Sequence, residues 1–528
     1  MRDGHDDDRR DRKAGDPAGI PAAESGPELP PDSATRTGAA GVQIGLEVGA
    51  KPGGETRRLA ANILAGGGVN IVKIALQLVM LPLMANLLGP SEFGVYALAL
   101  PTVVFFMTLA DGGLGASLAR EKADSEEVWS TAFWLVLAVG IGLGVILTVW
   151  GLVLAQLSHQ PRVAGVMAVL AISPIFVTSA VLPIARLTRE RRLAAISGAD
   201  LAGNLVGAVV AISLALAGAG AMSLAAQYVI IYLIRTFVLN VMAFRRPSLV
   251  FKPSALASHI STGSSLVCQR LADFSGRLAE NLLFSRLFGT AALGTYTFAN
   301  QVPRFVCEAA SGPVWGALYA HALREDDEQI GRLHAKLVHL LALLLAPVAF
   351  LASATVPGLV NLVLGPAWTD AATILSILIP FYSLNVIAGQ CGAILLAKGS
   401  GWTNFWLSVI QVCARIAAIP LGLWFGSVGI AWGIAAALLL YSLLAPLALK
   451  RIRISSVTAI LKNLMAPTVA GILAGLACHW VVQPAPSDVL RIALALIAGG
   501  VTYLVALVAL EGRRLKEDLV GIKRLIRR

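Results

Sequence analysis

The sequence predicts an all-α integral membrane protein with about 14 transmembrane helices. Two six-helix bundles, related by a pseudo-two-fold axis along the membrane normal, precede two further C-terminal helices. Three observations lead to this fold class. Hydrophobic residues make up 56% of the 528 residues and charged residues 14%, which is more apolar surface than a soluble protein can bury. Apolar runs long enough to cross a hydrocarbon core of about 30 Å recur along the chain. Basic residues gather in alternate connections between these runs.

Residues 1–57 differ from the rest of the chain. They begin "MRDGHDDDRRDRKAGD" and stay rich in Pro, Gly, Ala and charge without apolar periodicity, a composition that is typical of disorder. They contain no apolar run of the kind that a signal peptide needs. We therefore expect a disordered cytoplasmic N-terminal tail.

The apolar runs give the helices in order. Residues 58–250 hold six spans and form the predicted N-terminal bundle, residues 251–450 hold six more and form the C-terminal bundle, and residues 451–511 hold helices 13 and 14. The predicted spans are 62–86, 93–116, 129–156, 163–185, 194–217, 221–243, 260–286, 291–319, 333–356, 371–396, 402–424, 427–448, 459–482 and 489–510.

The basic residues predict how the chain threads the membrane. Counted with the adjoining first or last turn of each span, the connections after the even-numbered spans, up to the twelfth, hold 17 Lys and Arg residues, whereas the other seven connections hold only Arg162, Arg286 and Arg491. Because cytoplasmic loops carry the excess of Lys and Arg, both termini are predicted to be cytoplasmic. Residues 512–528, where apolar residues recur at helical spacing among Lys and Arg, are expected to form a basic amphipathic tail on the membrane surface.

An internal repeat predicts that the two bundles share one plan. The stretch "LLGPSEFGVYALA" (87–99) recurs as "LFGTAALGTYTFA" (287–299), exactly 200 residues later in register. Both copies fall at the outer turn between the first two helices of a bundle. A weaker similarity links 214–228 with 421–434, at the turn between the fifth and sixth helices. An offset of six spans keeps the direction of each helix, so the halves are expected to face one another around an axis along the membrane normal.

One predicted span carries four charges in its apolar sequence. Arg270, Asp273, Arg277 and Glu280 follow a 3, 4, 3 spacing, which at about 100° per residue places them within roughly 80° of arc. A charge at the bilayer centre costs about 2.5 kcal/mol or more on insertion scales. We therefore expect this stripe to face the protein interior.

Three other spans carry polar stripes of the same kind. Facing one another, such stripes predict a wet central cavity with mostly positive fixed charges, and an anionic cargo suits it because Arg offers a fork of donors to phosphate oxygens. The stripes are Asn70, Lys73 and Gln77 in the first span, Asn300, Arg304, Glu308, Ser311 and Trp315 in the eighth, and Asn404, Ser408, Gln411 and Arg415 in the eleventh.

These stripes, with Asp111 near the cytoplasmic end of the second span, supply the candidate site residues, and no catalytic residue, metal site or cofactor is expected among them. The acidic candidates have two open roles, structural pairing or coupling to H⁺ or Na⁺. Asp111 has a third open role, as a helix cap or gate residue. The predicted cargo contacts are Arg270, Arg277, Arg304, Arg415 and Lys73. The acidic candidates are Asp273, Glu280, Glu308 and Asp111. The polar residues of the predicted cavity are Asn70, Gln77, Asn300, Asn404 and Gln411.

Two stretches resemble a known family. Residues 85–121, "ANLLGPSEFGVYALALPTVVFFMTLADGGLGASLARE", resemble the first helical hairpin of Wzx-type polysaccharide flippases of the multidrug/oligosaccharidyl-lipid/polysaccharide exporter superfamily. Residues 362–380, "LVLGPAWTDAATILSILIP", resemble the turn before their tenth helix. The resemblance implies alternating access for undecaprenyl-pyrophosphate-linked oligosaccharide, serving exopolysaccharide, capsule or O-antigen synthesis. It also implies that Arg270, Arg277, Arg304 and Arg415 hold the pyrophosphate or acidic sugars.

The resemblance also sets the expected surroundings. It implies the bacterial inner membrane, with membrane lipids and the lipid-linked oligosaccharide as partners, a polysaccharide polymerase and export machinery as candidate partners, and a functional monomer. No nucleic acid partner is expected, because the net charge of +11 is explained by topology and tails.

Three alternatives stay open. A drug exporter of the same superfamily usually stops at twelve spans, and a lipid-linked peptidoglycan precursor flippase has the predicted 14. An integral-membrane glycosyltransferase or polymerase would need catalytic carboxylates in a sizeable outer loop. The acids of the short outward connections, Glu92, Asp370 and Asp488, make no convincing catalytic pair.

Overall fold

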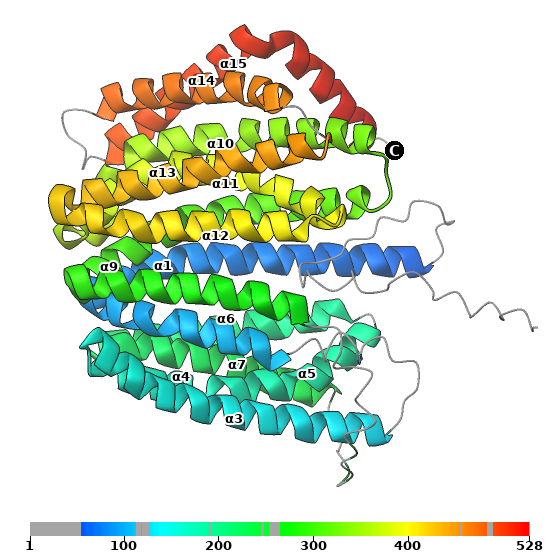
Figure 1. The fold of residues 1–528 in the computed structure, drawn as a ribbon, viewed down its shortest axis with the longest axis vertical. Helices are drawn as coiled ribbons and strands as arrows, with labels where there is room; N and C mark the ends of the chain where they lie inside the picture. Colours follow the sequence, from blue (N-terminus) through cyan, green and yellow to red (C-terminus); the bar gives the residue numbers. More distant parts are fainter. Residues whose placement is uncertain are drawn as a thin grey trace, which may run out of the picture. The chain divides into compact units, whose positions relative to one another are not determined.

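The described part of the chain is built from helices (Figure 1). A computed structural model describes residues 54–111, 126–190, 192–243, 264–454, 457–482 and 489–526, together with Leu118, Ser248, Val250 and Lys252. Its first helix begins at Gly54, just inside the predicted N-terminal tail. The rest of that tail lies outside the described residues.

The helices account for all of the predicted spans. Each predicted span overlaps a helix: α1 and α9 hold two spans each, and α4 with α5 forms the fourth. Ten segments of the described residues are long and apolar enough to cross a membrane; two of them, Ala75–Met107 and Gly401–Arg451, each join two predicted spans, and α9 is not among the ten. The all-α membrane fold is therefore confirmed. In chain order the helices are α1 (Gly54–Asp111), α3 (Glu126–Ser158), α4 (Arg162–Leu170), α5 (Ser173–Arg189), α6 (Leu193–Leu216), α7 (Ala221–Ala243), α9 (Ser264–Ala322), α10 (Asp327–Leu364), α11 (Thr369–Ala397), α12 (Gly401–Ala418), α13 (Gly422–Arg451), α14 (Val457–Val482) and α15 (Val489–Ile526), with short 3₁₀ turns at Pro366–Trp368 and Ile419–Leu421.

The two longest helices are hairpins. α1 and α9 each contain one residue with non-helical backbone angles, Gly89 (φ 74°, ψ 169°) and Gly289 (φ 83°, ψ 174°). Positive φ is costly for residues with a Cβ and open to glycine. Both glycines belong to the 200-residue repeat, so the turns predicted from it are present, and Figure 1 shows α1 (blue) turning back on itself. We keep the name outer turns for them, and the side of the membrane that they face stays a prediction.

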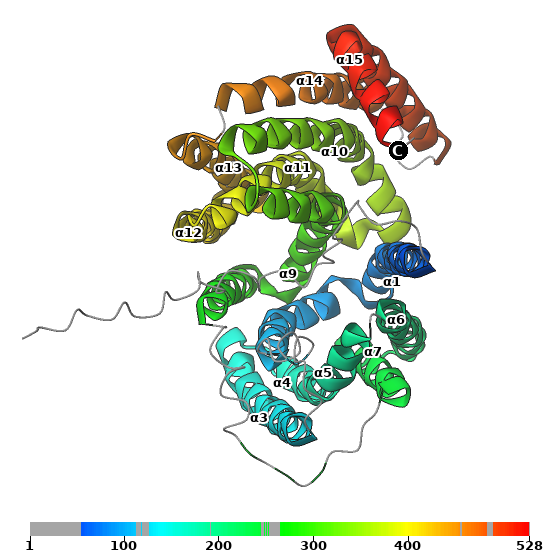
Figure 2. The same cartoon turned by 90° about the vertical axis from the view of Figure 1, so that its right-hand side faces the viewer.

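Packing between the helices follows the two predicted bundles. α3, α4, α5, α6 and α7 pack against α1 and one another. α10, α11 and α12 pack against α9, α13 packs against α11 and α12, and α14 and α15 pack beside α10 (Figure 2). The predicted boundary near residue 250 falls where few residues are described, so it stays a prediction.

A reciprocal contact between two glycines joins the bundles at their outer turns. A Cβ added to Gly94 would collide with the carbonyl of Thr290, and a Cβ added to Gly294 would collide with the carbonyl of Pro90. Each residue and its counterpart lie 200 positions apart, so the contact is the same in both directions, as two-fold symmetry requires. Small residues let membrane helices approach until their backbones touch. The predicted axis between the halves therefore passes beside these glycines.

Further contacts between α1 and α9 lie near this point and deeper along the helices. Ser91 Oγ and Thr290 Oγ1 are 3.5 Å apart, and Asn281 Nδ2 donates to the carbonyl of Ala97 at 2.8 Å. Further from the turns, the rings of Phe105 and Phe274 stack with centroids 4.3 Å apart. The two hairpins are thus in contact over much of their length.

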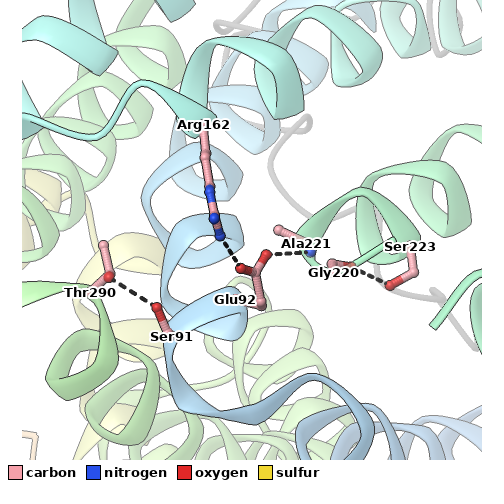
Figure 3. Close-up of polar contacts among 7 residues, drawn as sticks. All are labelled: Ser91, Glu92, Arg162, Gly220, Ala221, Ser223 and Thr290. Atoms are coloured by element: carbon pink, nitrogen blue, oxygen red, sulfur yellow. Dashed lines mark hydrogen bonds and ion pairs between the residues drawn. The ribbon is translucent and has the colours of Figure 1, made fainter. Parts of the chain in front are cut away.

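Glu92 fixes the outer end of the N-terminal bundle (Figure 3). Its Oε1 lies 2.5 Å from Nη1 of Arg162, at the start of α4, and its Oε2 accepts a hydrogen bond of 2.9 Å from the backbone N–H of Ala221, at the start of α7. A carboxylate is favourable at a helix N-terminus because the helix dipole is positive there. Gly220 (φ 57°) precedes this contact, and a Cβ on it would collide with the carboxylate. One side chain thus ties the α1 turn to two other helices.

The last helix combines the predicted helix 14 with the predicted basic tail. α15 runs to Ile526 with a break at Glu511 (φ −136°, ψ 22°). The Glu511 carboxylate lies 3.3 Å from Nε2 of His339 on α10, so the break is held where α15 meets α10. A helical backbone beyond the break agrees with the predicted tail helix, and its place on a membrane surface stays a prediction.

The glycine contact predicts the effect of adding a side chain there. In a Ser91→Cys/Thr290→Cys protein, Gly94→Val should slow disulfide formation about tenfold or more, because overpacking costs about 1–3 kcal/mol. Quantified cross-linking on gels measures this rate. Gly142→Val in α3 is the matched control, because a Cβ on Gly142 meets nothing within 4 Å. Equal rates in both variants would mean that the turns do not touch as described.

Candidate functional site

A buried polar cluster lies inside the C-terminal bundle. The guanidinium of Arg415, on α12, places Nη2 2.7 Å from Oε1 of Glu280 on α9. The hydroxyl of Tyr296 also donates to that Oε1 and lies 3.3 Å from the same Nη2. The hydroxyl of Tyr382, on α11, donates to Oδ1 of Asn300 at 2.6 Å. We call these five residues the Glu280 cluster.

Burial explains why the charges of this cluster are paired. The Glu280 side chain is 7% exposed and that of Arg415 20%, and the ring of Phe284 stacks on that of Tyr296 with centroids 4.4 Å apart. Removing one partner of such a pair would leave the other as an uncompensated buried charge. The contacts are those of an ion pair holding α12 to α9, and they occupy part of the Arg415 fork.

Two other predicted basic residues differ from Arg415 because they are exposed. Arg277 and Arg304 lie on the two arms of α9 and are both exposed. They stand 12 residues before and 15 residues after Gly289, so at 1.5 Å per residue both are about 20 Å from the turn. Two guanidinium groups at similar depth in an apolar protein are costly against lipid. We infer that water or a polar ligand reaches them.

A cavity of about 210 Å³ lies among α9, α11, α12 and α13. Gln411 from the predicted polar set lines it, and so do three other members of the predicted stripes, Ser311, Trp315 and Ser408. The stripes of the eighth and eleventh spans therefore do converge, inside the C-terminal bundle. A larger central cavity between the two bundles stays a prediction.

The remaining predicted residues are more scattered. Lys73 and Gln77 are half-buried on the first arm of α1. Asn404 is buried on α12, where a Cβ on Gly392 would lie 2.8 Å from its Oδ1, so α11 and α12 pack closely there. The side chains of five predicted residues lie outside the described part of the structure, although their backbones are helical: Asn70, Asp111, Arg270, Asp273 and Glu308.

Sequence reasoning missed two groups of residues. Arg235 on α7 and Asp200 on α6 form an ion pair of 2.6 Å within the N-terminal bundle. Asn385 and Gln390 of α11 line the cavity. The sequence contained a signal for both groups. The fifth and sixth spans each hold one isolated charge, and the apolar tenth span holds two isolated amides.

The architecture, two pseudo-symmetric bundles of long apolar helices with ion pairs inside them, is that of a multi-pass membrane protein. The chain belongs to the polysaccharide biosynthesis protein family, whose model matches residues 83–373. The predicted resemblance is therefore confirmed. Membership of this family also agrees with the expectation of a transporter in a bacterial inner membrane and not an enzyme.

Individual relatives and a solved structure agree with this assignment. The chain is 25% identical over 481 residues to the succinoglycan biosynthesis transport protein ExoT of Rhizobium meliloti (strain 1021), covering 89% of this chain and 95% of the relative. It is 22% identical over 368 residues to the lipopolysaccharide biosynthesis protein WzxC of Escherichia coli (strain K12), covering 69% and 75%. The inward closed conformation of the lipid II flippase MurJ shares the fold, with a TM-score of 0.68 at 12% identity over 87% of this chain and 100% of that one.

The ion pair of the Glu280 cluster gives a test of its structural role. Arg415→Met should destabilise the protein by about 3–5 kcal/mol, because Glu280 keeps a buried charge without its partner. Adding Glu280→Gln to the same protein should restore most of the loss. The thermal unfolding midpoint of the purified protein in detergent measures both effects.

The control for this test is an exposed pair. Arg332 lies 3.6 Å from Glu328, and the two side chains are 71% and 83% exposed, so Arg332→Met should change stability by no more than about 1 kcal/mol. An Arg415→Met protein as stable as the Arg332→Met protein would contradict the pairing.

Proposed function

We propose that this chain is a flippase that carries lipid-linked oligosaccharide repeat units from the inner to the outer leaflet by alternating access. The cargo would be an undecaprenyl pyrophosphate that bears the repeat unit of a surface polysaccharide. Family membership and similarity to ExoT along most of both chains support this class of cargo. They favour it over the drug exporter, and the fold shared with MurJ does not by itself favour the peptidoglycan precursor.

The observation that carries the proposal is the pair of exposed Arg residues on α9. Arg277 and Arg304 sit at about the same depth on the two arms of one hairpin and are exposed at a level where charge is costly against lipid. A diphosphate offers the oxygen acceptors that two guanidinium forks fit. The sugars would remain in water-filled space and the polyprenyl chain in lipid.

Three finer parts of the proposal follow from the sequence. Both termini would lie in the cytoplasm, because Lys and Arg are concentrated in the connections on that side. A proton or sodium gradient would give direction, with Asp273, Glu308 and Asp111 as candidate coupling residues. Glu280 is a weaker candidate, since Arg415 already neutralises it at 2.7 Å. A polysaccharide polymerase would take up the repeat unit on the outer side.

Deletion of the gene in its host tests the proposal. One surface polysaccharide should disappear, and its lipid-linked repeat unit should accumulate in the inner leaflet. Among complementing variants, Arg277→Ala and Arg304→Ala should each reduce export about tenfold or more, because a charge-assisted hydrogen bond contributes about 1.5–3 kcal/mol. Arg332→Ala, from the exposed pair, is the control and should restore export. Accumulation of a peptidoglycan precursor would refute the proposed cargo, and full export by both Arg variants at normal expression would refute their role.

The outer glycine contact tests alternating access. Cysteines at Ser91 and Thr290, whose hydroxyl oxygens are 3.5 Å apart, should form a disulfide that holds the outer turns together. Export should stop in the oxidised double variant and return after reduction, whereas each single variant should export normally. Export that continues through a complete cross-link would rule out a mechanism in which these turns must separate.

A further inference from the structure

The cavity in the C-terminal bundle has chemistry unlike that of the exposed Arg residues. Its lining includes the amides of Asn385, Gln390 and Gln411 and the hydroxyls of Ser311 and Ser408. The residues that line it include no Asp, Glu, Lys or Arg. Its volume of about 210 Å³ is many times the space that one water needs, and smaller than the range of about 300–1,000 Å³ that is typical of drug-sized ligands. It fits a small uncharged polar group.

One lining side chain is buried with an unused acceptor. Gln390 is 2% exposed, and its Nε2 donates to the carbonyl of Val386 at 3.1 Å. Its Oε1 has no hydrogen-bond partner among the described residues. Leaving a buried acceptor unsatisfied costs about 1–3 kcal/mol. A donor from outside the chain would remove that cost, and a hydroxyl that enters the cavity is such a donor.

An aromatic pair and a glycine complete the shape. Trp315 lines the cavity, and its ring stacks on that of Tyr319 at 5.5 Å with an interplanar angle of 5°, which limits its rotation. Gly389 also lines the cavity, and a Cβ there would meet nothing within 4 Å. A sugar ring presents hydroxyls at its edge and C–H groups on its faces. Amide side chains form hydrogen bonds with the hydroxyls. A rigid, apolar aromatic ring packs against the C–H groups.

Two of the helices that line the cavity, α9 and α12, also carry predicted basic residues. On α12, Gln411 precedes Arg415 by one helical turn, and on α9, Ser311 follows Arg304 by about two turns. These spacings place each pair on one face of its helix. The amides and hydroxyls of the cavity therefore lie about 6–10 Å along the two helices from Arg304 and from the Arg415–Glu280 ion pair, with Glu308 between Arg304 and Ser311 in the sequence.

We propose that this cavity is a glycosyl subsite, which takes one uncharged, hydroxyl-rich sugar ring of the cargo. Gln390 Oε1 accepts a hydrogen bond from a sugar hydroxyl, and Trp315 packs against the ring. The inference rests on the proposed function. It assigns the sugar a binding place of its own, separate from that of the diphosphate.

Binding by the full chain in lipid nanodiscs tests the subsite with two probes. One is undecaprenyl pyrophosphate without sugars, and the other is the same lipid bearing the repeat unit, extracted from the host. Wild-type protein should bind the sugar-bearing lipid more tightly. Gln390→Leu should weaken that binding about tenfold, the value expected for one lost hydrogen bond to a buried polar group. Gly389→Leu, whose side chain would fill space in the cavity, should weaken it by at least as much, and both variants should leave the affinity for the sugar-free lipid unchanged.

Two controls show whether the variants act through the cavity. Gly142→Leu makes the same substitution in α3, where a Cβ also meets nothing within 4 Å, and it should change neither affinity. Without lipid, Gln390→Leu should unfold at the same temperature as wild type or higher, because it removes the unsatisfied acceptor. A lower unfolding temperature with both lipids weakened equally would make Gln390 a packing residue and overturn the inference.

The remaining outcomes separate the subsite from the function. If both cavity variants bind the sugar-bearing lipid as wild type does, the cavity holds water only, and the inference fails while the flippase proposal stands. Equal affinity of wild type for the two lipids overturns the subsite in the same way. If wild type binds neither lipid, the proposed function fails and the subsite fails with it.

Discussion

Contact between two backbones, made possible by two missing side chains, is the constraint on which the rest of the structure depends. Gly94 and Gly294 bring the outer turns of α1 and α9 together so closely that one methyl group on either would collide with a carbonyl of the other hairpin. In a bilayer, lipid tails solvate an apolar helix as well as protein does, so close packing replaces the hydrophobic effect as the force between helices. The two bundles can meet this tightly because the repeat places a glycine at the same position in both.

The surroundings of each charged side chain determine whether it is buried in an ion pair or exposed. Inside the C-terminal bundle, Glu280 and Arg415 neutralise one another at 2.7 Å, and in the N-terminal bundle Arg235 and Asp200 do the same at 2.6 Å. Such pairs return little net stability, since both ions lose water, but they fix how neighbouring helices are rotated. On α9, Arg277 and Arg304 are exposed. Charge on α9 is therefore buried in an ion pair at Glu280 and reaches the surface at Arg277 and Arg304.

The sequence predicted what depends on local pattern. Apolar runs and glycine turns are patterns of neighbouring residues, and the repeat is such a local pattern found twice, 200 residues apart. Each appears in the structure where it was expected. The partners of individual charges were harder to predict from the sequence, because they depend on how helices rotate against one another. Glu280 was placed on the correct helix, but its contact with Arg415 crosses 135 residues. Glu92 had no predicted role because its partners lie 70 and 129 residues away.

Symmetry of the backbone is not matched by symmetry of the side chains. At the positions 200 residues before Glu280, Asn300 and Arg304, the N-terminal bundle has Met80, Leu100 and Val104. The glycines and Tyr96, the counterpart of Tyr296, are kept. Two hairpins of equal geometry are what a rocking motion about one axis requires, because each half must fit the other in more than one arrangement. Cargo has no such symmetry, since a glycolipid has one charged group and one chain of sugars. A protein that moves it needs the repeated glycines in both halves but not the same polar residues, and in this chain the positions of Glu280, Asn300 and Arg304 are polar only in the C-terminal half.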